Sequence, residues 1–364
     1  KEYSGEKVLI MGLGLNEGGA GTARFFLRMG ASVLVTDLKS KKELGPSVKK
    51  LLEFKNGCGK KCGRLDFILG KHRKKDFEDA DLIIQGPGVP NNSSFLAIAK
   101  KNKIPIDTDI GIFFEKCPAP IIGVTGSKGK STTAALIYNI LKQKFEDVIL
   151  AGNIGKSPLD FVGRIKPTTK VVLELSSWQL EGLARHKKSP HVAVIMNILR
   201  EHLNRYKSFR HYARAKALIL KYQKRGDYLV ISGQVAKILR IVASRQARRI
   251  IMFEPSRELN FNNVKFPASS SAVRLRSFAM TRGQNNTQNA AAAFTVGRIC
   301  GVSEKAINKA ILAFPGLPGR QEKIAEIKDI GKAGPLVLLS ELGGSKEKFN
   351  EKYSNVKVVG VGNL

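Results

Sequence analysis

Short apolar runs alternate with glycine-rich turns in the N-terminal third of the chain, a pattern typical of strands that lead into helices. The elements predicted here are strands at 8–11, 33–37 and 81–84, a glycine turn at 12–18 and a helix at 23–29. The first four of these in chain order form a βαβ unit of the dinucleotide-binding type. The turn Gly86-Pro-Gly-Val-Pro90 follows the last strand, so we expect it at the ligand-binding carboxyl edge of a parallel sheet.

The same pattern returns after a proline-containing segment at 117–120. The elements predicted there are strands at 121–124, 171–173 and 192–196, a helix at 131–142, and two late strands at 336–339 and 356–361. Strands that alternate with helices indicate an α/β fold. A length of 364 residues corresponds to two or three domains.

Composition narrows the class of protein. Apolar residues make up 43% of the chain, yet no run is long enough to span a membrane and residues 1–7 lack a secretory apolar segment. Four scattered cysteines predict reduced thiols rather than a disulfide framework or a zinc site. We therefore expect a cytoplasmic protein.

The net charge of +32 suggests two kinds of partner. Basic clusters at 71–75, 185–188, 221–225 and 245–249 could meet nucleic-acid phosphates. They are spread along the chain without a nucleic-acid-binding motif, so we interpret them as a solvated basic surface that also attracts anionic substrates.

Residues 123–133 (Gly-Val-Thr-Gly-Ser-Lys-Gly-Lys-Ser-Thr-Thr) have the composition of a phosphate-binding loop. The loop lies between a predicted strand and a predicted helix, where free backbone N–H groups and the helix dipole favour a phosphate. Lys130 adds a cation and the Ser131 hydroxyl can ligate Mg²⁺. Val124 replaces the first glycine of the strict motif, so this is a variant loop. The pattern predicts binding of a nucleoside triphosphate.

Polar residues follow two of the strands predicted after this loop. Glu174 ends one strand, and Asn197 and Glu201-His202 follow the other. Carboxylate and imidazole groups at that edge, next to a phosphate loop, are suited to hold Mg²⁺ on ATP.

Several spaced motifs resemble, in the same order, those of the Mur ligases. They are the phosphate loop and the segments at 152–155, 174–180, 201–206, 212–216, 283–289 and 318–320. The resemblance covers about residues 7–322 and is greatest to the members that add D-glutamate. It implies three α/β domains: a Rossmann-like UDP-sugar domain at 1–117, a P-loop ATPase-type domain at 118–318 and an abbreviated Rossmann-like amino-acid domain at 319–364.

The resemblance also implies an activity, the ATP-dependent ligation of D-glutamate to UDP-N-acetylmuramoyl-L-alanine in peptidoglycan precursor synthesis. ATP would phosphorylate the substrate carboxylate, and the amine of D-glutamate would displace phosphate from the acyl phosphate. The partners would be these substrates, ATP and Mg²⁺, with no nucleic acid and no membrane span, and the protein would be a monomer.

Site residues carry over by position in the motifs. The catalytic residues would be Lys130, Glu174, His202 and Lys216. The last would be carbamylated by CO₂ and would support Mg²⁺ together with Ser131, Glu174 and His202. ATP would contact Gly126, Ser127, Lys128, Gly129, Lys130, Ser131, Thr132, Asn286 and Arg320. The UDP-sugar would contact Asn16, Asp37, Gly86, Pro87, Gly88, Val89, Asn153, Ser176 and Gln179.

The chain departs from the family pattern in a few places. Asn204 replaces an aspartate, and Asn285 and Gly319 replace histidines. After residue 330 the ribose-binding segment of the third domain has no counterpart, and Lys346 resembles a residue near the glutamate site. Two alternatives stay open: a Mur ligase that adds another amino acid, and a noncatalytic or nucleic-acid-binding P-loop ATPase.

Overall fold

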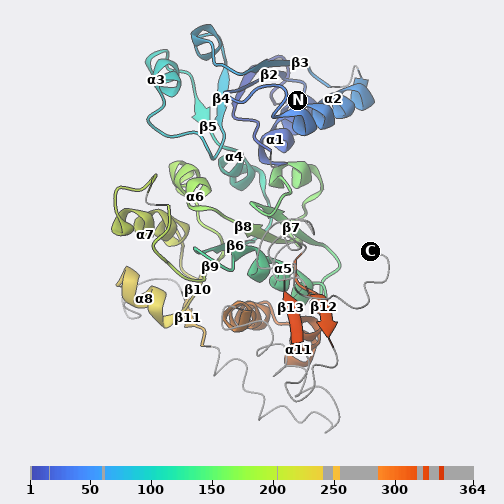
Figure 1. Cartoon of the computed structure of the whole chain (residues 1–364), viewed down its shortest axis with the longest axis vertical. Helices are drawn as coiled ribbons and strands as arrows, with labels where there is room; N and C mark the ends of the chain where they lie inside the picture. Colours follow the sequence, from blue (N-terminus) through green and yellow to red (C-terminus); the bar gives the residue numbers. More distant parts are fainter. Residues whose placement is uncertain are drawn as a thin grey trace. The chain divides into compact units, whose positions relative to one another are not determined.

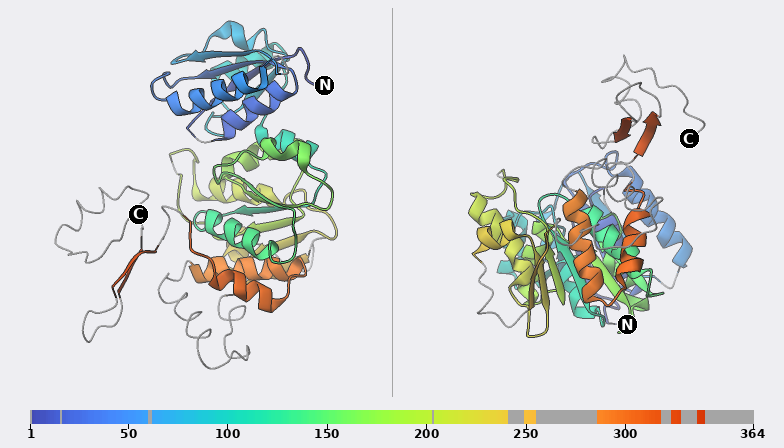
Figure 2. Two further views of the ribbon diagram at one scale, coloured as in Figure 1. Left: turned by 90° about the vertical axis from the view of Figure 1, so that its right-hand side faces the viewer. Right: turned by 90° about the horizontal axis from the view of Figure 1, so that it is seen from below.

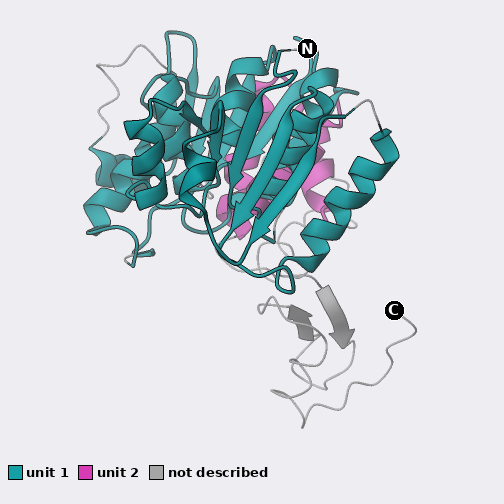
Figure 3. Ribbon diagram, turned by 90° about the horizontal axis from the view of Figure 1, so that it is seen from above, with its two compact units in different colours: residues 1–130, 145–252 teal, residues 131–144, 253–364 magenta. Residues whose placement is uncertain are grey.

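The computed structural model describes residues 2–15, 17–59, 62–202, 204–240, 249–254, 286–317, 323–327 and 336–339. The chain divides into two units, residues 1–130 with 145–252 and residues 131–144 with 253–364 (Figure 3). The first unit contains two parallel sheets, and the candidate site is built mainly from it.

The N-terminal sheet is parallel, with strands in the order β3-β2-β1-β4-β5 (Figure 1). Its elements are β1 (Lys7–Met11), α1 (Glu17–Arg28), β2 (Ser32–Asp37), α2 (Gly45–Cys58), β3 (Leu65–Leu69), η2 (Lys74–Phe77), β4 (Leu82–Gln85), α3 (Ser94–Lys101), β5 (Ile106–Asp107) and α4 (Asp109–Lys116). Side chains alternate along a strand, so Ile10 joins the core that includes Phe26 of α1, whereas Leu9 joins a separate core with Leu96 of α3. Helices therefore cover both faces (Figure 2).

The central sheet is also parallel, in the order β11-β10-β9-β6-β8-β7. Its elements in the first unit are β6 (Ile121–Thr125), β7 (Val148–Gly152), η3 (Pro158–Arg164), β8 (Lys170–Glu174), α6 (Ser177–Leu183), η4 (Ala184–His186), β9 (Val192–Ile195), α7 (Phe209–Ala217), η5 (Leu218–Leu220), β10 (Tyr228–Ile231), α8 (Gly233–Leu239) and β11 (Arg249–Met252). Leu180 of α6 and Tyr212 of α7 are fully buried in the same core as Ile195. The carboxyl ends of β6, β8 and β9 thus meet at one edge, beside α6 and α7.

The described residues of the second unit form helices and one pair of strands. Helix α5 (Lys130–Leu141) begins at Lys130, the last residue of the first unit's N-terminal segment, and continues into the second unit. Residues 286–299 form a further helix, and α11 (Glu304–Leu312) follows it. A Cβ on Gly297 would lie 2.7 Å from Cγ2 of Ile140, so the 286–299 helix packs directly on α5. Strands β12 (Lys323–Ile327) and β13 (Leu336–Leu339) pair antiparallel.

The apolar runs predicted the central strands correctly. The structure confirms strands at 8–11, 33–37, 81–84, 121–124, 171–173, 192–196 and 336–339, each within a residue or two. Helix α1 begins earlier than expected, at Glu17. Strand β3 was not predicted, because its residues are only half-buried and Asp66 interrupts the apolar pattern. The strand predicted at 356–361 lies outside the described residues.

The cysteines correct one expectation. Cys58 and Cys62 form a disulfide, whereas the sequence predicted reduced thiols throughout; Cys117 and Cys300 take no part in a disulfide. The end of α2 brings the two Cα atoms to 5.8 Å, within the usual range for a disulfide. Within the described ranges, the helices are too short or too polar to span a bilayer.

Candidate functional site

The phosphate loop connects β6 to α5, and one side chain holds its backbone. Asn197, just after β9, accepts from Lys128 N through Oδ1 at 2.8 Å and donates to Lys128 O through Nδ2 at 3.1 Å. Its own carbonyl accepts from Ser127 N at 3.0 Å. A Cβ on Gly126 would lie 2.9 Å from Cβ of Met196, so only glycine fits between the loop and β9. The loop is therefore preorganised for phosphate.

Two lysine ammonium groups converge on one carbonyl of this loop. Lys130 Nζ donates to the carbonyls of Gly126 and Ser127 at 3.0 and 2.7 Å, and Lys216 Nζ donates to Gly126 O at 2.7 Å. Lys216 is only 2% exposed. Burial and then the charge of Lys130 lower the pKa of Lys216 to about 7, against the opposite effect of nearby carboxylates. Such a lysine is a nucleophilic amine near neutral pH.

Helix α7 carries a second contact to the loop. Tyr212 precedes Lys216 by one helical turn, and its hydroxyl is 3.1 Å from Ser127 Oγ, which also accepts from Leu199 N at 2.9 Å. Tyr212 is not among the predicted site residues, although its spacing from Lys216 places both on one helix face. Helix α7 thus holds the loop through a hydroxyl and an ammonium.

Glu174, at the end of β8, is 1% exposed and only half hydrogen-bonded. Its Oε1 accepts from Asn153 Nδ2 at 2.9 Å, and its backbone carbonyl accepts from Asn153 N at 2.9 Å. Its Oε2 is buried and has no hydrogen-bond partner among the residues that the structure describes. Asn153, expected at the UDP-sugar, therefore lies beside the carboxylate and orients it.

An unpartnered buried carboxylate oxygen fits a hard cation such as Mg²⁺. No group of three or more His, Cys, Asp or Glu side chains that could hold a metal gathers in the described part of the chain. Mg²⁺ commonly takes one or two protein carboxylates with substrate phosphates and water, so Glu174 suits it. His202 is exposed, with a left-handed φ of 55°, and its ring lies against Trp178 and Tyr212.

Three described residues that were predicted to contact ATP belong to the second unit. Ser131 is buried directly after Lys130 in α5, with Thr132 next to it. Asn286 begins the 286–299 helix; Asn289 Nδ2 donates to its Oδ1 at 3.1 Å, and Asn289 Oδ1 accepts from Thr133 at 3.3 Å. Asn286 is thereby tied to α5.

The glycine turn after β1 is organised by Asp37. Its Oδ2 accepts from Leu13 N at 2.9 Å and from Gly14 N at 3.1 Å, and its Oδ1 accepts from Lys39 N. Asp37 thus shapes the turn from the end of the neighbouring strand β2. Asn16, Arg320 and Lys346 lie outside the described residues.

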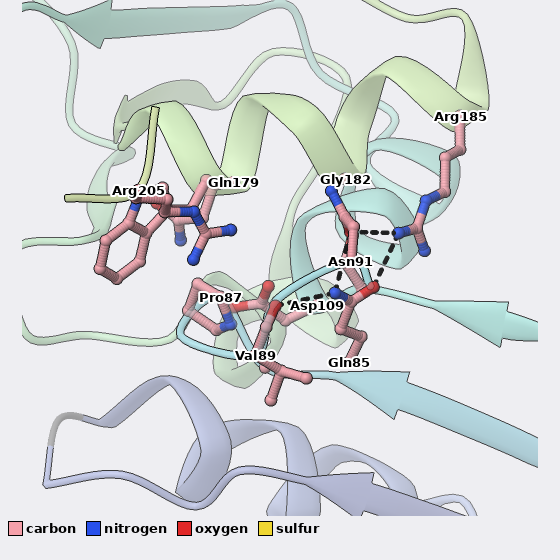
Figure 4. A pocket seen from close by; sticks show the side chains of 12 residues that line it. Gln85, Pro87, Val89, Asn91, Asp109, Gln179, Gly182, Arg185 and Arg205 are labelled. Atoms are coloured by element: carbon pink, nitrogen blue, oxygen red, sulfur yellow. Dashed lines mark hydrogen bonds between the residues drawn. The ribbon is translucent and has the colours of Figure 1, made fainter. Parts of the chain in front are cut away.

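A pocket separates the turn after β4 from helix α6 (Figure 4). Gly86, Pro87 and Val89 line one side and Gln179 the other. Ser176 and Gln179 also form a capping box at the start of α6, which the Ser-x-x-Gln spacing encodes.

Three charged residues that line this pocket were not predicted, namely Asp109, Arg185 and Arg205. Asp109 begins α4 in the interior, and burial raises its pKa to about 6. Arg205 lies over the Trp178 ring, 4.4 Å from its centroid. The residues of this pocket come from distant parts of the chain, so no local pattern groups them.

Comparison with known proteins matches two parts of the chain to family models. Residues 6–108 match the family model for the Mur ligase MurD-like N-terminal domain, and residues 124–297 match the Mur ligase middle domain. The chain is 34% identical over 351 residues to the UDP-N-acetylmuramoylalanine--D-glutamate ligase of Roseiflexus sp. (strain RS-1), covering 90% of this chain and 72% of that protein.

A second relative and a solved structure are also similar to this chain. The enzyme of the same name from Borreliella burgdorferi (strain ZS7) is 37% identical over 265 residues, which cover 73% of this chain but 55% of that protein. The crystal structure of UDP-N-acetylmuramate:L-alanyl-gamma-D-glutamyl-meso-diaminopimelate ligase from Neisseria meningitides superposes with a TM-score of 0.59 at 14% identity, covering 86% of this chain and 99% of that one. This likeness concerns the fold.

Proposed function

This chain belongs to the Mur ligase family, and we propose that it is the ATP-dependent ligase that joins D-glutamate to UDP-N-acetylmuramoyl-L-alanine. The observation that carries the proposal is the phosphate loop with Lys130 and Lys216 on Gly126 O, beside the unpartnered oxygen of Glu174. We retain residues 1–117, 118–318 and 319–364 as its three domains, and a cytoplasmic location follows from its soluble nucleotide substrates.

The proposed reaction has two steps. The γ-phosphoryl group of ATP passes to the substrate carboxylate, which gives ADP and an acyl phosphate; the amine of D-glutamate then attacks the acyl carbon, expels phosphate and forms the amide. Loop N–H groups and Lys130 neutralise phosphate charge. To do so, the Lys130 ammonium must leave the loop carbonyls to which it donates in this structure. Glu174, Ser131 and His202 would hold Mg²⁺, which would supply further charge neutralisation for the two anions.

Carbamylation of Lys216 belongs to the same proposal. The unmodified ammonium would repel a cation near Glu174, whereas addition of CO₂ to the neutral amine gives an anion and releases a proton. Burial beside Lys130 favours the neutral amine. Gly86, Pro87, Val89 and Gln179, which line the pocket, would bind the UDP-sugar together with Asn16, Asp37, Gly88, Asn153 and Ser176. Asn286 and Arg320 would contact ATP.

The test is ADP release by the purified chain with ATP, Mg²⁺, bicarbonate and UDP-N-acetylmuramoyl-L-alanine, in the presence of D-glutamate, L-glutamate, D-aspartate, meso-diaminopimelate or no amino acid. We expect release only with D-glutamate and an amide product by mass, and almost none from Lys130→Ala. Release with another amino acid would reassign the acceptor. ATP hydrolysis that ignores the UDP-sugar and responds to DNA or RNA would overturn the proposal.

A further inference from the structure

The turn between β4 and α3 is held by a ring of side-chain hydrogen bonds. Gln85 Nε2 donates to Val89 O at 2.9 Å and to Asn91 Oδ1 at 3.0 Å. Arg185 donates through one terminal nitrogen to Gln85 Oε1 at 2.7 Å and to Asn91 Oδ1 at 3.0 Å (Figure 4). One guanidinium group therefore joins the residues that flank the turn on both sides.

Arg185 reaches the turn from the opposite wall of the pocket. It lies in η4, which directly continues α6, and α6 presents Gln179 and Gly182 to the same pocket. The start of α6 is fixed by its Ser176–Gln179 capping box. Arg185 thus ties one wall of the pocket to the other.

The chemistry of this contact favours positioning over stability. Arg185 is exposed, and its two acceptors are neutral amide oxygens, so the contact adds little to the free energy of unfolding. A guanidinium group can nevertheless hold two acceptors in a fixed geometry, which a lysine ammonium on a flexible stem does poorly. Binding sites need their walls held close to the productive geometry, so a loosened wall weakens substrate binding.

We propose that Arg185 is a positioning residue that bridges Gln85 and Asn91 to hold the 86–90 turn against helix α6 for binding of the UDP-sugar. The inference rests on the proposed function. It assigns to Arg185 no contact with the reacting atoms.

The test compares Arg185→Ala and Arg185→Lys with wild-type protein. We expect Arg185→Ala to raise KM for the UDP-sugar, and its Kd by calorimetry, about 5- to 20-fold, while kcat and KM for ATP stay within twofold. Arg185→Lys should recover part of the lost affinity for the UDP-sugar. The control is Arg249→Ala, which should change neither constant. Arg249 donates to Tyr228 OH at 2.8 Å between β11 and β10, and neither residue lines the pocket.

A double variant separates the bridge from a general effect of charge. If Arg185 acts through Gln85, the Gln85→Ala and Arg185→Ala double variant should bind the UDP-sugar within about twofold of the weaker single variant. An unchanged Kd in Arg185→Ala, or an equal loss for ATP, would overturn the inference. Wild-type protein that does not bind the UDP-sugar would instead refute the proposed function.

Discussion

Lys216 has an environment that few lysines share. It is buried, it donates to the phosphate loop, and Lys130 donates to the same carbonyl. Because its pKa is lowered to about 7, the neutral amine that attacks CO₂ predominates at pH 8 and declines below pH 7.

We therefore expect ¹³C-labelled bicarbonate to give a carbamate carbon signal in NMR spectra of the wild-type protein, stronger at pH 8 than at pH 6.5. Lys216→Ala should lack the signal, whereas Lys188→Ala, which removes an ion-paired surface lysine, should keep it. A signal that survives in Lys216→Ala would locate the modification elsewhere.

Asp109 lowers stability at neutral pH. Burial raises its pKa to about 6, so the folded state holds its proton over a pH range in which the unfolded chain has already lost it. The free energy of unfolding therefore falls as pH rises from about 4 to 6, and the loss persists above that range.

The variant Asp109→Asn removes this titration and keeps an oxygen for the N–H of Ile110. We expect its free energy of unfolding to exceed that of wild type by about 1–3 kcal/mol at pH 7.5 and by much less at pH 4, as measured by urea unfolding. An equal difference at both pH values would show that the carboxyl group does not titrate abnormally.

At the scale of elements, helix α1 packs without a gap against η3. Gly21 faces Ser157 so closely that a Cβ on Gly21 would lie 2.0 Å from the serine Cβ. Arg24 of the same helix donates to both carboxylate oxygens of Asp160, at 2.9 and 2.5 Å. This contact joins the two sheets of the first unit.

Gly21→Ala should consequently lower the free energy of unfolding by about 1–3 kcal/mol, through a forced displacement of backbone. Adding Ser157→Gly should restore part of the loss. Gly57→Ala, in α2 with open space around it, is the matched control and should be neutral or slightly stabilising. Comparable losses in both alanine variants would argue against close packing of α1 on η3.

Local sequence patterns predict the helices and strands better than they predict the contacts between these elements. Apolar runs located β1, β6, β8 and β9 because central parallel strands are buried on both faces. The half-buried edge strand β3 gave no such signal. The bridge from Arg185 to Gln85 spans 100 residues, and the clamp of Asn197 on Lys128 spans 69, so neither could be inferred from spacing. The motif resemblance singled out Lys130, Glu174 and Lys216. In the structure both lysines donate to Gly126 O, and the roles of all three residues stay predictions.

At the scale of the whole molecule, the net charge of +32 acts on substrates that are themselves anions. A basic surface raises the local concentration of ATP and UDP-sugar, and salt screens this attraction, with a Debye length that falls from about 10 Å at 0.1 M to about 3 Å at 1 M. The same charge underlies the alternative of a nucleic-acid-binding protein, so the salt dependence of each reaction distinguishes the two.

We expect kcat/KM for ATP and for the UDP-sugar to fall several-fold between 50 and 500 mM salt, while kcat stays within about twofold, because screening affects encounter more than chemistry. The salt dependence of kcat/KM for D-glutamate should be weaker, because D-glutamate is a smaller anion, and it serves as the internal control. Duplex DNA or RNA should inhibit at low salt as a competing polyanion without stimulating ATP hydrolysis. A kcat/KM that does not respond to salt would mean that the basic surface has no part in substrate capture, and stimulation by nucleic acid would favour the alternative.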